Sequence, residues 1–153
     1  MNYDTLLEEA NSHGLIVKEK NLVSSDGRIK GNKIAIRKDI DTEVEKSCVL
    51  AEELGHYYTS SGDILDQSGT MNCKQEYRAR LYGYNLKIGL MGIIQAYEAG
   101  ARNLYEMAEF LDVTEIYLME ALECYKSKYG IYAKIDNYII YFNPKLAVMK
   151  ITC

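Results

Sequence analysis

Apolar residues recur at spacings of three and four along most of this chain, which is the periodicity of an amphipathic helix. The pattern predicts six helices, over residues 3–12, from Asp41 or Thr42 to about 60, and over 72–88, 91–99, 103–111 and 114–129. The mainly polar residues 63–71 predict a loop between the second and third of these helices.

Shorter runs rich in β-branched and aromatic residues predict strands. Residues 28–36 and 131–142 are each expected to form a hairpin, the first with Gly31-Asn32 as its two-residue turn. Further strands are expected at residues 15–19 and 147–151. The sequence therefore predicts an α+β fold, mostly helical, with a small antiparallel sheet and hairpins.

The chain has 153 residues and a formal net charge of −4. This length predicts a single domain over residues 1–153, with a core over about 1–90 and a helical and hairpin segment over about 91–153. The acidic balance excludes nucleic-acid or anionic-membrane binding driven by overall charge, although local basic patches remain compatible with it.

Several features bear on the compartment in which the protein works. No apolar run approaches the ~20 residues that span a bilayer, and residues 1–4 lack the layout of a signal peptide. The four cysteines are widely scattered and form no C-x-x-C pair. We therefore expect free thiols, a cytoplasmic protein and no membrane partner.

The segment Leu50-Ala51-Glu52-Glu53-Leu54-Gly55-His56 differs by one residue from the zinc-peptidase motif H-E-x-x-H. Residues four apart share one face of a helix, so Glu52 and His56 can point at one metal ion. Glu53 has the position of the general base in such enzymes. Glutamate replaces the first histidine of the motif.

A peptidase zinc has three protein ligands and an open position for water, whose proton a nearby carboxylate accepts. Glu76, on the next predicted helix, fits a third ligand beside His56, and Glu52 supplies the remaining one. One histidine with two carboxylates forms a harder site than two histidines with one glutamate, so Mn or Mg competes with zinc. An empty site is the alternative, since acidic residues and histidine are common on solvated helix faces.

Other polar residues near the motif have simpler interpretations. His13 follows a helix end, which favours a local cap over a metal ligand. Asp63 and Asp66 follow the motif helix and either orient His56 or solubilise a loop.

The aromatic and basic neighbours of the motif leave two interpretations each. Tyr57 and Tyr58 either hydrogen-bond a tetrahedral intermediate or pack in a core or groove. Arg78 and Arg80 either pair with acidic groups of the site or remain solvated.

The run VLAEELGHYYTSSGDI, followed by KQEYRARLYGYNL, resembles the ImmA/IrrE family of metallopeptidases in its phage and integrative-element form. The resemblance covers most of the chain and extends to LYEMAEFLDVTEIYLMEALECYKSKYG. It implies a minimal zincin with a small sheet and packed helices. Carried over by position, it makes Glu53 the general base and His56 and Glu76 metal ligands, with Glu52 in the place of the first histidine ligand.

Members of that family often cleave a helix-turn-helix repressor and so derepress a mobile element. The resemblance therefore implies a cytoplasmic zinc-dependent endopeptidase with a phage-type repressor as its substrate. A catalytically weak or inactive module that binds the repressor without cutting it is the alternative. A second alternative is a DNA-binding regulator using residues 103–129, which resemble a helix-turn-helix. The acidic Glu115, Glu120 and Glu123 of this segment argue against direct nucleic-acid binding.

Overall fold

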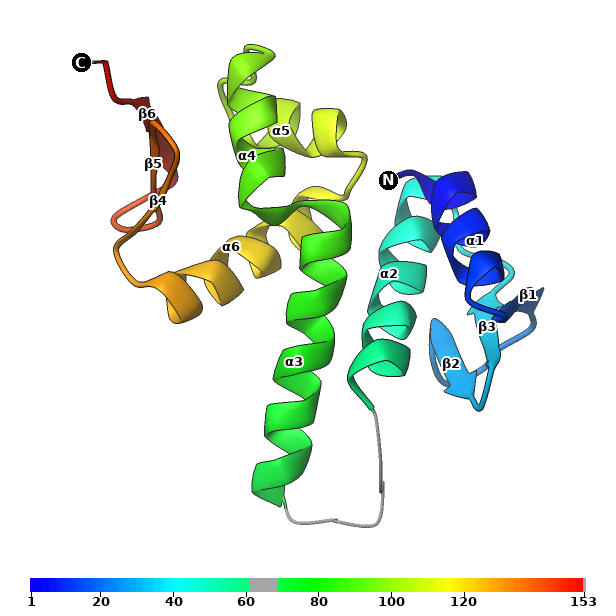
Figure 1. Cartoon of the computed structure of the whole chain (residues 1–153). Helices are drawn as coiled ribbons and strands as arrows, with labels where there is room; N and C mark the ends of the chain where they lie inside the picture. Colours follow the sequence, from blue (N-terminus) through cyan, green and yellow to red (C-terminus); the bar gives the residue numbers. More distant parts are fainter. Residues whose placement is uncertain (61–68, 153) are drawn as a thin grey trace. The chain divides into compact units, whose positions relative to one another are not determined.

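The computed structural model describes residues 1–60 and 69–152, and for residues 69–72 it describes the backbone only. The described chain forms two compact units, Met1–Lys87 and Ile88–Cys153. Figure 1 shows that both units combine helices with a small sheet, so the predicted α+β class is confirmed.

The first unit contains three helices and three strands: α1 (Tyr3–Ser12), β1 (Ile16–Lys20), β2 (Gly27–Lys30), β3 (Lys33–Arg37), α2 (Glu43–Thr59) and α3 (Gly69–Lys87). The side chains of Asn2 and Thr42 accept hydrogen bonds from the first-turn amides of α1 and α2. Such caps satisfy amides that have no partner inside the helix, so they fix where each helix begins. Of the two residues predicted to cap α2, Thr42 is the one that does so.

The helix predicted over residues 72–88 begins three residues earlier, at Gly69. Residues 69–71 therefore belong to α3 and not to the predicted loop, of which residues 63–68 lie outside the described part. Gly69 and Thr70 are weak helix formers without apolar periodicity, which is why the pattern gave no sign of this first turn.

The sheet of the first unit has the strand order β1-β3-β2. The predicted hairpin is confirmed, because β2 and β3 pair in antiparallel register around residues 31–32. The expectation of a small antiparallel sheet is correct for β2 and β3 and wrong for β1, which pairs with β3 in parallel. β3 carries Ile34 and Ile36, both almost fully buried, and takes the central position between the other two strands. Because β1 and β2 run in opposite directions, a strand inserted between them must be parallel to one of them, and that one is β1.

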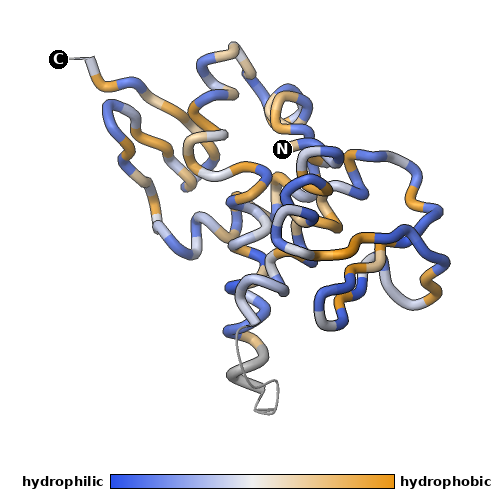
Figure 2. Tube along the Cα trace, turned by 45° about the vertical axis from the view of Figure 1, so that its right-hand side comes forward, coloured by the Kyte–Doolittle hydropathy of each residue, from blue (hydrophilic) through white to orange (hydrophobic). Residues whose placement is uncertain are grey.

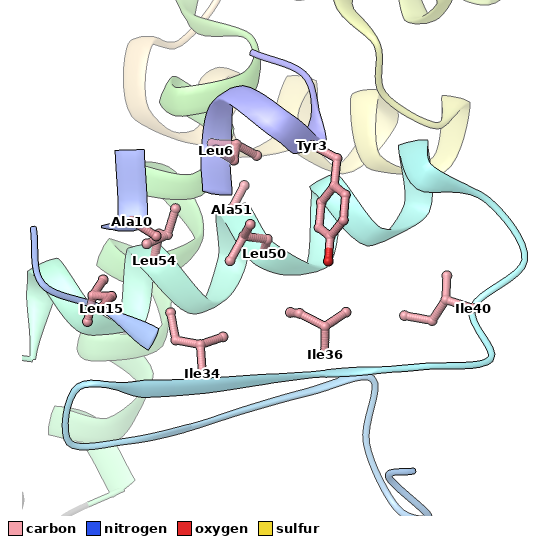
Figure 3. Packing of buried hydrophobic residues seen from close by; sticks show 10 residues of the cluster. All are labelled: Tyr3, Leu6, Ala10, Leu15, Ile34, Ile36, Ile40, Leu50, Ala51 and Leu54. Atoms are coloured by element: carbon pink, nitrogen blue, oxygen red, sulfur yellow. The ribbon is translucent and has the colours of Figure 1, made fainter. Parts of the chain in front are cut away.

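The core of the first unit lies between this sheet, α1 and α2. Figure 3 shows Ile34 and Ile36 of β3 pointing towards Leu50 and Leu54 of α2, while α1 covers the same helix with Leu6. Fully burying one such side chain contributes about 1.5–3 kcal/mol to folding. This packing fixes which faces of α2 remain available for chemistry.

The second unit contains α4 (Gly89–Glu98), α5 (Leu104–Leu111), α6 (Glu115–Tyr129), β4 (Tyr132–Ile135), β5 (Tyr138–Tyr141) and β6 (Ala147–Lys150). Its three strands form an antiparallel sheet in the order β4-β5-β6, so the second hairpin and its added edge strand are confirmed.

Figure 2 shows hydrophilic and hydrophobic positions alternating along the chain trace, as expected for elements with one buried face.

Two further expectations concern thiols and membranes. Cys48, Cys73 and Cys124 form no disulfide within the described part of the chain, and Cys153 lies outside it. No helix among the described residues is both long enough and apolar enough to cross a membrane.

Candidate metal centre

Helix α2, which carries the motif, buries one face in the core and leaves the neighbouring face partly exposed. Leu50, Ala51 and Leu54 are fully buried against the core. Glu52, Glu53 and His56 are partly exposed. At 100° per residue, Glu52 and His56 lie on one side of α2, one turn apart. The core packing therefore turns the motif towards the surface without removing it from water.

Helix α3 packs antiparallel to α2 along a seam of small residues. A Cβ atom added to Gly55 would lie 2.1 Å from the Ala79 carbonyl oxygen. A Cβ atom added to Gly83 would lie 3.0 Å from the Ala51 carbonyl oxygen. Only glycine allows the two backbones to approach so closely. Figure 1 shows the two helices side by side in the first unit.

This close packing brings Glu76 of α3 to the motif. One ligand atom each from Glu52, His56 and Glu76 lies within 4.8 Å of the others. His56 Nε2 and Glu76 Oε2 are 3.7 Å apart. The side chain of His56 is 27% exposed and that of Glu76 is 42% exposed. The three residues that the sequence nominated as ligands are therefore neighbours in the folded chain.

Arg80 fixes the orientation of the Glu76 carboxylate. Its Nε donates a hydrogen bond of 3.0 Å to Glu76 Oε1, one turn away on the same helix. The other oxygen, Oε2, is left facing His56. Of the two alternatives for Arg80, pairing with an acidic group of the site is confirmed, and the i, i+4 spacing was the available signal.

Glu53 lies in a different environment from Glu52. Burial raises the pKa of Glu53 from 4.5 to about 7, while nearby His56 lowers it and the carboxylates of Glu52 and Glu76 raise it further. A carboxyl group with a pKa near neutrality is suited to accept and return a proton. The structure thus places a carboxyl group suited to proton transfer beside the three candidate ligands.

Gly27, at the start of edge strand β2, makes room for Glu53. A Cβ atom on Gly27 would lie 2.7 Å from Glu53 Oε1 and 2.8 Å from Val49 Cγ1. No real Cβ atom approaches so closely, so any other residue here would displace the carboxyl group. Gly27 could not be predicted from the sequence, because no spacing rule connects a strand glycine with a helix residue 26 positions later.

The remaining candidates take structural roles or lie outside the described residues. His13 is the C-cap of α1, and its Nδ1 lies 2.9 Å from the Glu9 carbonyl oxygen, which confirms the local interpretation. Its ring also meets the ring of Tyr58 edge-on, with centroids 5.2 Å apart. Tyr58 packs against Tyr57 and Tyr82, so packing is its role here. Asp63 and Asp66 fall outside the described residues.

The donor set fits a divalent cation. Tetrahedral zinc with bonds of 2.0–2.2 Å separates its ligand atoms by about 3.4 Å. The observed 3.7 Å between His56 Nε2 and Glu76 Oε2 is close to this value, and since all three ligand atoms lie within 4.8 Å of one another, side-chain rotation must close the remaining separations. Imidazole favours zinc, whereas two carboxylates equally suit Mn or Mg. The residues present thus fit one borderline or hard ion with a position left for water.

Comparisons with models of protein families, with curated proteins and with solved structures find no match to this chain. The functional argument therefore rests on the residues and their geometry.

Proposed function

We propose that this chain is a zinc-type metallo-endopeptidase of minimal zincin architecture that acts in the cytoplasm on a phage-type helix-turn-helix repressor. The observation that carries the proposal is the convergence of Glu52, His56 and Glu76, with Glu53 beside them. Glu52, Glu53 and His56 come from α2, and Glu76 comes from α3. A solvated helix face by itself gives no such convergence. The choice of repressor as substrate rests on the resemblance to ImmA/IrrE peptidases.

Each side chain has a defined task in the proposed reaction. His56, Glu76 and Glu52 hold the ion, which when bound supplies the Lewis acidity that polarises a carbonyl and acidifies water. Glu53 accepts the proton of the attacking water and returns it to the leaving amine. In the metal-free protein its pKa is about 7, and a cation held beside it would lower that pKa and favour the carboxylate that accepts the proton. Arg80 holds Glu76 with one carboxylate oxygen facing His56.

A module that binds the repressor without cutting it is the second candidate. One observation favours it: Arg80 already neutralises Glu76 through a hydrogen-bonded ion pair. Together with glutamate in place of the first histidine, this pair weakens the attraction of the site for zinc. In this alternative the same residues form a metal-free polar cluster on the helix surface.

Direct DNA binding by α5 and α6 is the least favoured of the candidate functions. Three residues connect the two helices, as in a helix-turn-helix, and Asp112 adopts a left-handed backbone at the end of α5. However, the exposed positions of α6 include Glu115, Glu120 and Glu123. These carboxylates would repel the phosphates beside a major groove.

Co-expression with a phage-type helix-turn-helix repressor tests the proposal. Wild type, Glu53→Gln and His56→Ala are compared by mass measurement of the repressor. We expect fragments with the wild type only, and a loss of about 10²–10⁴ in rate for Glu53→Gln, since glutamine cannot accept the proton.

Metal content separates the remaining outcomes. Glu53→Gln should keep the bound ion, whereas His56→Ala should lose it, as measured by mass spectrometry of the native protein. Equal cutting by all three proteins would assign cleavage to a host protease. Intact repressor that co-purifies with the wild type would favour the binding module.

A further inference from the structure

The outer face of the first sheet carries a concentration of positive charge in a chain of net charge −4. A hollow of about 400 Å³ lies on this face. Five basic residues line it, from all three strands: Lys18, Lys20, Arg28, Lys30 and Lys33. All five are exposed. We call these residues and their hollow the basic face.

The cations of the basic face lack the carboxylate partners that a neighbouring cation of the same sheet has. Arg37 of β3 is paired with Asp26 at 3.2 Å and with Asp39 at 3.1 Å. Within the described part of the chain, none of the five lining cations has a carboxylate within 4.0 Å. No acidic residue lines the hollow. Like charges gathered without counter-charges destabilise a fold slightly, so their presence points to an anionic partner.

The floor of the basic face is apolar. Ile16, Leu22 and Ala35 line the hollow among the cations. Lys18 and Arg28 are both register partners of Ala35, on opposite sides of β3. At ~4.8 Å between strands, their Cα atoms lie about 9–10 Å apart. A small apolar residue is thus flanked by two long cationic side chains.

We propose that the basic face docks an extended acidic segment of a partner protein that carries an apolar side chain between its carboxylates. In an extended peptide, every second side chain lies on one side, about 6.6–6.8 Å apart. An apolar side chain over Ala35 then places carboxylates two residues away on each side within reach of Lys18 and Arg28. This docking goes beyond the proposed cleavage and does not depend on it.

Nucleic acid fits the basic face less well. A duplex presents mainly phosphates and sugars on its outside, and its apolar thymine methyl groups lie within the major groove, where an exposed sheet face with a shallow hollow does not reach them. Single strands are held by stacking their bases on aromatic rings, and no aromatic residue lines the hollow. An acidic peptide segment with an apolar side chain can contact both the cations around the hollow and its apolar floor.

Fluorescence anisotropy with the full chain tests this docking. The probe is a short labelled peptide in which glutamate and leucine alternate on one side of the extended chain, separated by serine. Two control peptides replace glutamate by glutamine, or leucine by serine. We expect the probe to bind more tightly than either control, and binding to weaken as salt is raised.

Variants locate the binding. Lys18→Gln with Arg28→Gln should weaken binding of the probe by about three- to thirtyfold, from two exposed ion pairs. Lys134→Gln with Lys145→Gln removes the same charge from exposed positions of the second unit and should leave the affinity unchanged. The assay measures peptide binding alone and uses no cleavage or metal readout, so a failed peptidase assay does not affect this result.

Three outcomes would overturn the inference. One is equal loss of affinity in both double variants. Another is the absence of binding at about 1 mM peptide, which is weaker than any useful docking site. The third is tighter binding of duplex DNA than of the probe, with loss in the Lys18→Gln and Arg28→Gln variant, which would make the face a nucleic-acid surface.

Discussion

The candidate metal centre and the basic face concentrate opposite charges in the same unit by different means. At the metal centre, Glu52 and His56 meet Glu76, a residue of another helix, only because α2 and α3 pack closely. On the basic face, the alternation of side chains puts the cations of each strand on one side of the sheet. The pairing of the three strands then brings these cations next to one another. One cluster depends on a single helix contact, whereas the other follows from the sheet itself.

This difference predicts different sensitivities. A cluster held by helix packing should be lost when the helices separate, even if every charged residue is retained. A cluster on an exposed sheet face should change only with its own side chains. Substitutions in each cluster should therefore differ in how strongly they change stability and binding.

Gly55→Ala should have the largest effect, on the helix contact. Alanine favours a helix by about 1 kcal/mol over glycine, but its Cβ would lie 2.1 Å from the Ala79 carbonyl oxygen. We expect a loss of about 3 kcal/mol in the free energy of unfolding, measured with urea, together with weaker metal binding as Glu76 moves away.

Gly92→Ala in α4 is the matched control for this change. There a Cβ would meet only the end of the flexible Leu111 side chain, at 3.1 Å. Its stability should stay near that of the wild type. A Gly55→Ala protein as stable as this control would show that α2 and α3 do not pack closely.

Glu53→Gln should change how stability depends on pH in the metal-free protein. The native state keeps the Glu53 proton up to about pH 7, whereas an unfolded chain releases it near 4.5. Between these values the native state binds more protons, so the free energy of unfolding falls as pH rises. Because Glu53 is partly exposed, we expect a fall of only about 1–3 kcal/mol.

Glutamine has no charge to desolvate, so Glu53→Gln should remove most of this fall. Thermal unfolding in a chelator on both sides of the interval measures it. Glu8→Gln, at an exposed position of α1, should keep the wild-type slope. If the free energy of unfolding depended on pH in the same way in all three proteins, Glu53 would not be buried as described.

Glu52→His rebuilds the H-E-x-x-H motif and should tighten zinc binding by about tenfold or more, since imidazole suits zinc better than carboxylate does. A competitive titration against a chelator measures the change. Glu45→His, in the first turn of the same helix, is the control and should leave the affinity unaltered. Equal zinc affinity of Glu52→His and wild type would remove Glu52 from the ligand set.

Lys18→Gln with Arg28→Gln should have the smallest effect on folding. Both side chains are exposed and no carboxylate lies within 4.0 Å of either in the described part. The free energy of unfolding should change by less than about 0.5 kcal/mol, or rise slightly as like charges are removed. A loss of several kcal/mol in urea unfolding would show that these cations support the sheet.

Local sequence alone determined much of this protein. The apolar periodicity placed the six helices, and the two-residue Gly31-Asn32 turn placed the first hairpin. The spacing of Glu52 and His56 already put both on one side of α2, because a helix repeats every 3.6 residues. These features depend on residues that are close together in the chain, so a single sequence contains them.

The tertiary structure decided which distant segments meet. The sequence nominated Glu76 from its place downstream, but only the packing of Gly55 and Gly83 brings it to 3.7 Å from His56. The contact of Gly27 with Glu53 and the parallel pairing of β1 with β3 had no signal in local spacing. Such contacts follow from burying all apolar faces of the unit at once, and that condition is a property of the whole fold.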